Sequence, residues 1–395
     1  MSTQQKGLTP GKPPIWNDPH YRALFFQILL IVGLGLFLVF LVNNTLDNMA
    51  NRDISTGFGF LSERSGFDIL QSLIPYSADS TYGRTFVVGL LNTILITVLG
   101  IILATILGFI IGIARLSNNW LIAKLATVYI ETFRNIPLLI QIFFWYFVVL
   151  RAMPSARQSF SFNDSFFLNV RGLYMPSPVA GESFHLTLIA LAVALVAAFF
   201  LRRWARKRQH ATGQQFPVLW TALGIVIGLP LLVFIATGSP LSWDIPELKG
   251  FNFRGGTSII PELLALLIAI SIYTAAFIAE IVRSGILAVN RGQTEAALSV
   301  GLTPRQTLRL VVIPQAMRVI IPPMTSQYLN LAKNSSLATA IGYPDIVSVF
   351  MGTTLNQTGQ AVEITAMTMA VYLTLSLTIS ILMNWYNAKM ALVER

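Results

Sequence analysis

Long apolar runs constrain this chain more than any other feature of its sequence. A helix needs roughly twenty residues, most of them apolar, to cross the hydrocarbon core of a bilayer. Of the 395 residues, 54% are hydrophobic and 11% are charged, whereas a soluble domain carries about 25% charged residues. We therefore predict an all-α polytopic membrane protein with about eight spans, near residues 25–42, 86–113, 121–150, 184–201, 217–236, 259–281, 318–340 and 363–385.

The distribution of positive charge predicts the direction of these spans. The net charge is +10, and in a multi-pass protein such an excess collects in cytoplasmic loops, so it does not indicate nucleic-acid binding. The densest basic cluster is Arg202-Arg203-Trp204-Ala205-Arg206-Lys207-Arg208. Counting spans outward from it places both termini and the turn at 115–124 in the cytoplasm, and the loop 43–85 outside. The first apolar segment is expected to remain as an anchor, because the polar residues before it do not resemble a secretory signal.

Several kinds of chemistry are excluded or left without residues to support them. The chain has no cysteine, which excludes disulfides and thiolate sites. Its histidines, His20, His185 and His210, are too far apart to have metal-ligand spacing. No G-x-x-x-x-G-K-[ST] phosphate loop is present, and the only Gly-Lys pair, Gly11-Lys12, lies in the polar N-terminal stretch. We therefore expect no catalytic residue, metal or cofactor on this chain.

The segment 121–150 is too long for a simple crossing. Pro137 disfavours helical geometry at Ile136, so a break is expected there. Residues 120–133 are expected to lie along the cytoplasmic face. The segments 151–183 and 237–258 are polar and rich in Pro and Gly, and they are expected to form external loops.

A short amphipathic stretch at 290–314 is unusual in so apolar a chain. Thr294 is expected to cap a first helix that begins at Glu295 and stops at Gly301. Thr303-Pro304-Arg305-Gln306 fits a capping box, and the second helix is expected to end near Val312, before Pro314.

The second helix of this stretch has two different faces. Leu308, Val311 and Val312 share an apolar face, and Arg305 and Arg309 share a basic one. Exposed apolar surface outside the bilayer indicates a protein partner. The alternative is an amphipathic loop resting on the membrane. A DNA-binding helix–turn–helix is excluded, since membrane spans close on both sides leave no room to enter a groove.

Polar side chains within membrane segments are costly unless they face a cavity or a partner. The best candidates for a substrate path lie in 318–340, where a stripe of about 120° holds Ser326, Gln327, Asn330, Lys333 and Asn334. A lysine with amides suits the carboxylate and ammonium of an amino acid, but a polar helix–helix interface is an equal alternative. Gln141 and Asn92 are weaker path candidates. Glu131 with Arg134, and Glu280 with Arg283, are i,i+3 pairs expected to neutralise each other, as structural ion pairs or as a gate.

Several motifs together resemble the polar amino-acid permeases of type I ABC importers, the histidine, glutamine and general L-amino-acid permease family. Glu295-Ala296-Ala297, Gly301 and Val311-x-Ile313-Pro314 are similar to the EAA loop of that family, with Ile313 where Leu is usual. Further matches are Glu131-Thr-Phe-Arg134-Asn-Ile-Pro137, Tyr273-Thr-Ala-Ala-Phe-Ile-Ala-Glu280-Ile-Val-Arg283-Ser-Gly285, Gly292-Gln293 and Lys333-Asn334-Ser335-Ser336-Leu337.

The resemblance implies a five-helix importer core with one N-terminal and two inserted helices, as in the larger permease subunit of general amino-acid importers. Its parts would be 1–85, with the tail, first helix and periplasmic loop; 86–150, the first part of the core; 151–257, the insertion; and 258–395, the rest of the core with the EAA loop at 290–314.

The resemblance also implies a function and partners. The chain would be the non-catalytic permease subunit of an ATP-driven importer of polar L-amino acids in the bacterial inner membrane. Glu295, Ala296, Ala297, Gly301, Arg305, Arg309 and Pro314 would couple it to a dimeric ABC ATPase, which would bind ATP and magnesium. A second permease subunit in a heterodimer and a periplasmic amino-acid-binding protein are also expected.

Two other classes of protein remain as alternatives. A secondary transporter would be driven by an ion gradient, and it would show inverted repeats and broken helices in both halves. A structural membrane scaffold would not need the lysine and amide stripe. Uptake driven by ATP in a preparation with its partner subunits would distinguish the importer from the secondary transporter.

Overall fold

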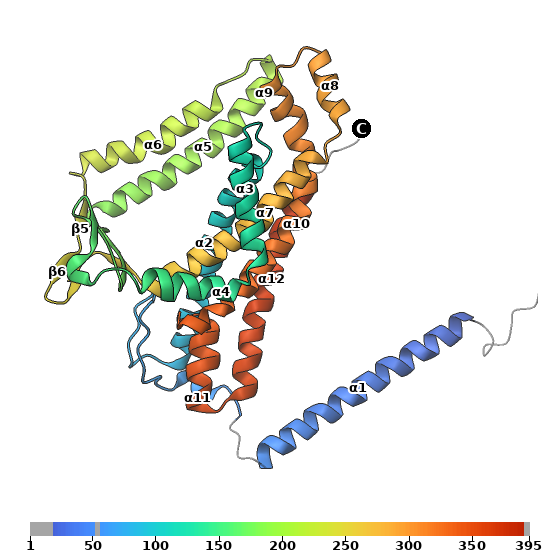
Figure 1. The fold of residues 1–395 in the computed structure, drawn as a ribbon, viewed down its shortest axis with the longest axis vertical. Coiled ribbons are helices and arrows are strands. Elements are labelled where there is room, and N and C mark those ends of the chain that lie inside the picture. Colours follow the sequence, from blue (N-terminus) through green and yellow to red (C-terminus); the bar gives the residue numbers. More distant parts are fainter. Residues whose placement is uncertain (1–18, 52–55, 391–395) are drawn as a thin grey trace, which may run out of the picture.

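A computed structural model describes residues 19–51 and 56–390, and it is built mainly of helices (Figure 1). In chain order the helices are α1 (Pro19–Asn51), α2 (Tyr82–Ala114), α3 (Trp120–Asn135), α4 (Leu138–Phe143), α5 (Phe184–Thr212), α6 (Val218–Ala236), α7 (Pro261–Leu287), α8 (Arg291–Ser299), α9 (Pro304–Thr307), α10 (Ile313–Asn334), α11 (Leu355–Thr358) and α12 (Ala361–Met390).

Six helices in the described part of the chain are long and apolar enough to cross a membrane: α1, α2, α5, α6, α7 and α12. The pair formed by α3 and residues 138–150 is a seventh, bent by 105° at the expected break. Ile136 there is extended, with φ −95° and ψ 125°. The expected break is therefore confirmed, while the position of 120–133 along the cytoplasmic face stays a prediction.

The remaining expected span, 318–340, corresponds to α10, which is helical but is not apolar enough to count among the membrane-crossing helices. Two prolines, Pro322 and Pro323, lie inside it, together with the polar stripe. Its α-helix ends at Asn334, and residues Ser335–Ile341 continue as a 3₁₀ helix. A helix with this composition needs neighbouring protein rather than lipid along part of its length.

The centre of the core is the contact between α2 and α7. Gly108 and Gly112 face α7 so closely that a Cβ atom on Gly108 would lie 2.5 Å from Ile278 Cγ2, and one on Gly112 would lie 2.6 Å from the Ala279 carbonyl oxygen. Small residues four positions apart let membrane helices approach closely. The packed centre of the molecule therefore depends on the absence of side chains along one face of α2.

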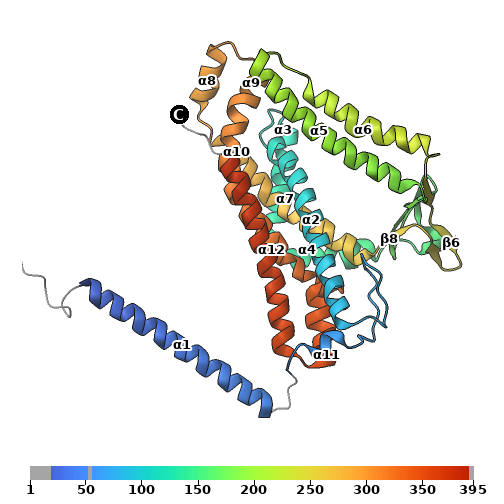
Figure 2. The ribbon, with the colours of Figure 1, turned by 180° about the vertical axis from the view of Figure 1, so that it is seen from behind.

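The helices run between two distinct ends of the molecule (Figures 1 and 2). One end, called here the α8 end, holds α8, α9, the turn between α2 and α3, the last turns of α5 and the last turn of α12. The other end, called the sheet end, holds the strands and the loop that precedes α2. The basic loops expected in the cytoplasm thus gather at one end, as a single topology requires. The N-terminal tail lies outside the described residues.

The sheet end contains short strands within the segments that were expected to form external loops. β1 (Phe160–Phe162), β2 (Phe166–Asn169), β3 (Gly172–Met175) and β8 (Thr257–Ile259) form an antiparallel sheet in that order. Two further pairs are β4 (Ser177–Ala180) with β5 (Leu241–Asp244), and β6 (Glu247–Lys249) with β7 (Asn252–Arg254). Strands of three or four residues are too short to produce a clear alternation of apolar and polar residues. The sequence therefore did not reveal these strands, and the external position of 151–183 and 237–258 stays a prediction.

The two helices α5 and α6, which lie in the expected insertion, form a hairpin in which they pack against each other. The buried residues of α5 are all small: Ala190, Ala194 and Ala205. α1 lies apart from the bundle in both views, and its side chains from Tyr21 to Thr45 are exposed. An apolar helix with every described face exposed is consistent with a span surrounded by lipid or by another subunit.

Candidate functional site

The helix α8 begins earlier than the sequence predicted. Its N-cap is Asn290, whose side-chain oxygen accepts a hydrogen bond of 2.8 Å from the Gly292 amide. Thr294 lies inside the helix rather than at its cap. Asn and Thr are both good capping residues, so the sequence alone did not separate the two positions, and the expectation of a Thr294 cap was wrong.

The expected stop of α8 at Gly301 is confirmed. Gly301 has a φ of +86°, a conformation that other L-residues rarely adopt. Its amide donates to the Leu298 carbonyl at 3.0 Å, and the Leu302 amide donates to the Ala297 carbonyl at 3.2 Å. These two bonds form a Schellman motif, which ends a helix and fixes the direction of the following chain. α8 is therefore joined to the next helix by a defined turn.

The expected capping box of the second helix is also confirmed. The Thr303 amide donates to Gln306 Oε1 at 2.9 Å, and the Gln306 amide donates to Thr303 Oγ1 at 3.4 Å. However, the helix does not end before Pro314. α9 passes through a π-helical turn, Leu308–Val312, directly into α10.

The wider turn explains how the helix passes Pro314. In the π-turn the Ile313 amide donates to the Leu308 carbonyl, five residues back. Such a turn rearranges the i to i−4 ladder just where a proline lacks its donor and its ring would crowd the preceding turn. The expected helix end near Val312 was therefore wrong.

The α8–α9 module presents mostly exposed residues at the α8 end. Glu295, Ala296, Arg305 and Arg309 are exposed, whereas Ala297 is buried. Exposed apolar side chains accompany them: Leu298, Val300, Leu308 and Leu310. Among the described residues no ion pair involves Glu295 or either arginine. The module thus offers charges and apolar surface to a partner outside this chain.

The apolar face expected in the second helix is not a single surface. Leu308 is exposed, while Val311 and Val312 are half-buried against the rest of the chain. The π-turn changes the angle per residue, so positions i, i+3 and i+4 do not share one face there. Pro314 is likewise half-buried.

The polar stripe on α10 remains accessible. Ser326, Asn330 and Lys333 are exposed, and Gln327 and Asn334 are half-buried. None of these five side chains forms a hydrogen bond or an ion pair with another residue that the structure describes. A structural helix–helix interface within this chain would have paired them. The stripe is therefore open to a ligand path or to a second subunit.

The two weaker path candidates are buried and hold backbone carbonyls, and their place on a path stays a prediction. Gln141 is buried, and its Nε2 donates to the Phe133 and Ile136 carbonyls at 3.0 and 2.9 Å. These carbonyls are left without helical donors by the break at Pro137. Asn92 is buried as well, and its Nδ2 donates to the Gln71 and Pro344 carbonyls at 2.8 and 2.9 Å.

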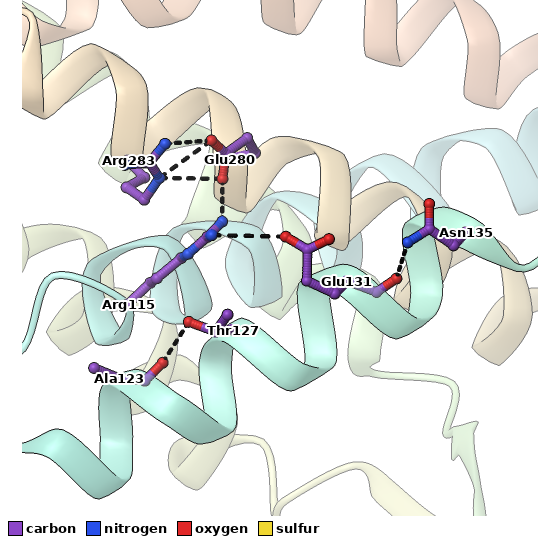
Figure 3. Close-up of polar contacts among 7 residues, drawn as sticks. All are labelled: Arg115, Ala123, Thr127, Glu131, Asn135, Glu280 and Arg283. Carbon is purple, nitrogen blue, oxygen red and sulfur yellow. Dashed lines mark hydrogen bonds and ion pairs between the residues drawn. The ribbon is translucent and has the colours of Figure 1, made fainter.

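The charged residues near the α8 end form a network that differs from the expected pairs (Figure 3). Glu280 pairs with Arg283 as expected, with 2.5 Å between Arg283 Nη2 and Glu280 Oε1. Glu131 does not pair with Arg134. Its carboxylate lies 3.7 Å from Arg115 Nη2, while the Arg134 guanidinium lies over the Phe277 ring at 5.3 Å.

Arg115, which sequence reasoning placed only in a basic turn, connects this network. It follows the last residue of α2 and hydrogen-bonds the Glu280 carboxylate on α7 while reaching Glu131 on α3 (Figure 3). Its side chain is only 19% exposed. No short-range spacing in the sequence could reveal the contact, because Arg115 and Glu280 are 165 positions apart. Three helices are thus joined by charge-assisted contacts at one point.

Comparison with known proteins places this arrangement in a family. The family model described as "Binding-protein-dependent transport system inner membrane component" matches residues 190–392. The chain is 57% identical to a "Putative amino-acid ABC transporter permease protein YhdX" of Escherichia coli strain K12, over 96% of both chains.

Two other relatives are also similar over nearly their whole length. Identity is 56% to the "General L-amino acid transport system permease protein AapQ" of Rhizobium johnstonii, over 96% of this chain and 94% of the relative. It is 42% to the "Glutamate/glutamine/aspartate/asparagine transport system permease protein BztB" of Rhodobacter capsulatus, over 96% of both. A solved chain in the "Crystal structure of an amino acid ABC transporter with histidines" is 21% identical, with a TM-score of 0.45, over 78% of this chain and 95% of that one.

The chain is thus a multi-pass transport component. It belongs to the inner membrane components of binding-protein-dependent transport systems, among the amino-acid ABC transporter permeases. Members of this family work with ATPase and binding-protein partners.

Proposed function

We propose that this chain is the larger permease subunit of an ATP-driven importer that carries polar L-amino acids across the bacterial inner membrane. It would receive them from a periplasmic binding protein at the sheet end. The names of the similar proteins support an amino-acid substrate. Both termini and the α8 end would lie in the cytoplasm.

The observation that carries this proposal is the α8–α9 module. Two capped helices meet at a defined turn, carry unpaired charges and expose apolar side chains. A short, rigid element transmits displacement better than a flexible loop. We propose that Glu295, Ala296, Ala297, Gly301, Arg305, Arg309 and Pro314 form or support the surface that docks on a dimeric ABC ATPase. ATP and magnesium would bind on that partner, because this chain has no phosphate loop.

The polar stripe of α10 is the proposed path for the substrate. Lys333 suits a carboxylate, and the amides of Gln327, Asn330 and Asn334 can donate and accept hydrogen bonds to either end of an amino acid. Ser326 adds a hydroxyl on the same side. The stripe is accessible and unpaired within the described chain. A second permease subunit, forming a heterodimer, would close the other side of this path.

The charged network at Arg115, Glu131, Glu280 and Arg283 would act as a structural clamp. It joins α3 and α7 to the residue that follows α2, and these are the helices that would keep their relative positions while α8 is displaced. Arg134, held over Phe277, is a separate contact. The alternative is a gate that opens during transport, in which case the network would break in one state.

The proposal is tested with the complete transporter reconstituted in vesicles. Labelled amino acid and the binding protein are supplied outside, and ATP inside. Uptake is expected only with ATP and the ATPase subunit present. Uptake by this chain without ATP, driven by an ion gradient, would show a secondary transporter instead. No uptake under either condition, from a complex that assembles normally, would favour a structural scaffold.

Two variants test the docking surface directly. Glu295→Arg reverses an exposed charge, and Gly301→Pro removes both the positive φ and the amide that ends α8. Both are expected to insert normally and to lose the ATPase subunit on purification.

Two matched controls alter the same features elsewhere. Glu182→Arg reverses an exposed charge at the sheet end, and Gly213→Pro changes a helix-ending glycine with a φ of +72° at the end of α5. Both controls are expected to keep the ATPase. Normal co-purification in Glu295→Arg and Gly301→Pro would contradict the docking role.

A further inference from the structure

One strongly basic surface is not used by the proposed transport mechanism. It lies on the last turns of α5 and forms an open groove of about 500 Å³ lined by Phe199, Arg202, Arg203, Arg206, Lys207 and His210. All six side chains are exposed. We call it the α5 basic groove.

The groove residues share one face of α5. At 100° per residue they fall within a stripe of roughly 140°. Ala205, which is buried in the hairpin, lies on the other side of the helix. The groove therefore faces away from α6, and its cationic side chains point outward from the hairpin.

The cations of the groove have no partners within the chain. Across residues 19–51 and 56–390, no ion pair or hydrogen bond involves the side chains of Arg202, Arg203, Arg206 or Lys207. Arg208 differs, since its guanidinium lies over the Trp204 ring at 5.4 Å and donates to Gln214 Oε1 at 3.0 Å. Unpaired clustered cations are a binding surface for anions, because their mutual repulsion is relieved when an anion binds.

The same face of α5 continues as an apolar surface. Going toward the sheet end from the groove, the exposed side chains on this face are Phe199, Val196, Leu195 and Leu188. A cationic surface followed along the helix axis by an apolar one matches a molecule with an anionic head and a hydrocarbon tail. Phe199 belongs to both parts, at the boundary between them.

We propose that the α5 basic groove binds the phosphate headgroups of anionic phospholipids in the leaflet at the α8 end, and that their acyl chains lie along the apolar face of α5. This site goes beyond the transport function and would hold the inserted hairpin in place beside the core. Clusters of basic residues next to the cytoplasmic end of a membrane helix are known to attract anionic headgroups. From Phe199 to His210 the groove spans about 16 Å of helix, enough for more than one phosphate.

The size of the effect follows from the number of cations. Each Lys or Arg near an anionic membrane surface contributes about a factor of five in binding. Arg203→Gln is thus expected to weaken binding about fivefold, and Arg203→Gln with Arg206→Gln about 25-fold. Arg208→Gln removes the same charge from the same helix, but from a residue held against Trp204, and it is expected to change binding less than twofold.

The test measures lipid bound to the purified transporter complex by native mass spectrometry. Phosphatidylglycerol and phosphatidylcholine with the same acyl chains are titrated separately. The wild type is expected to bind phosphatidylglycerol preferentially, the double variant to lose that preference, and Arg208→Gln to keep it. Arg203→Lys with Arg206→Lys keeps the charge and is expected to retain binding.

Several outcomes would overturn the proposal. One is equal retention of the two lipids by the wild type, a result that needs no variant to fold. Another is full displacement by millimolar inorganic phosphate, which would make the groove a site for free anions. A third is loss of the ATPase subunit from the double variant with lipid binding unchanged, which would make the groove a protein-docking surface. Because the docking variants of α8 leave α5 unaltered, failure of this proposal is distinguishable from failure of the proposed function.

Discussion

A close approach between α2 and α7 gives a prediction whose size follows from the geometry. Gly112 on α2 lies against α7, where an added Cβ would be 2.6 Å from the Ala279 carbonyl oxygen and 2.9 Å from Val282 Cβ. Ordinary van der Waals contact begins at 3.4 Å, about 0.8 Å farther than the first of these distances. A backbone carbonyl cannot rotate away, so Gly112→Ala has to separate the two helices.

The expected cost is that of overpacking a tight interior, about 1–3 kcal/mol. Alanine also favours the helix by about 1 kcal/mol relative to glycine in water, and this gain must be subtracted from the overpacking cost. Gly224→Ala provides the control, since Gly224 lies inside α6 with nothing within 4 Å of its added Cβ. The difference between the two variants isolates the close approach of α2 and α7.

The measurement is equilibrium unfolding of the purified protein in mixed micelles, with increasing denaturing detergent. Gly112→Ala is expected to have a free energy of unfolding about 1–3 kcal/mol lower than Gly224→Ala. The same change should weaken the Arg115–Glu280 contact, because Arg115 is three residues beyond Gly112 and Glu280 follows Ala279. If the two variants unfolded at the same detergent concentration, the tight α2–α7 contact would be refuted.

Three smaller changes test other contacts. Arg115→Gln is expected to lower the free energy of unfolding by about 1.5–3 kcal/mol, because the partly buried Glu280 loses a charged hydrogen bond. Arg134→Gln is the control, since it loses only a cation–π contact of about 0.5–1 kcal/mol. Equal losses of stability in the same detergent titration would argue against the network. Gln141→Leu removes the donor to two carbonyls at the α3–α4 break, so the free energy of unfolding should fall by about 1–3 kcal/mol. A variant as stable as the wild type would show that water replaces the lost donor. Thr303→Ala removes the cap of α9, which should lower the free energy of unfolding by about 0.5–2 kcal/mol and speed amide hydrogen exchange in α9. Unchanged exchange would count against the capping box.

Local sequence patterns predicted the helical architecture well, because their causes are local. Apolar runs of sufficient length gave the membrane helices, Pro137 gave the break after α3, and Gly301 and Thr303 gave the turn between α8 and α9. In each case the deciding interaction lies within a few residues of the chain. The errors at Thr294 and Pro314 arose where the local pattern fitted two structures. Either of two residues could serve as the cap of α8, and a π-turn could accommodate the proline.

Long-range contacts could not be predicted in this way. Arg134 has the right helical spacing to pair with Glu131, yet the Glu131 carboxylate instead faces Arg115, which follows another helix, and Arg134 lies over Phe277. Gln141 and Asn92 were identified as polar residues within membrane segments, and that much was right. Whether such a residue faces a path or supplies a missing hydrogen bond depends on the backbone around it. The stripe on α10 has no such backbone partners, so its role as a substrate path stays a prediction.

The pairing of β3 with β8 has a consequence for how a chain of this kind could gain or lose a segment in evolution. Met175 and Thr257 are direct partners in the sheet, so the chain leaves the core and returns to it at neighbouring points. The segment 176–256, which includes α5 and α6, therefore forms a branch whose two ends are adjacent in the sheet. A unit whose ends lie close together can be gained or lost without rerouting the remaining chain. Because α5 and α6 are both long and apolar enough to span a membrane, the branch would cross it twice, and its loss would leave the direction of α7 and every later helix unchanged.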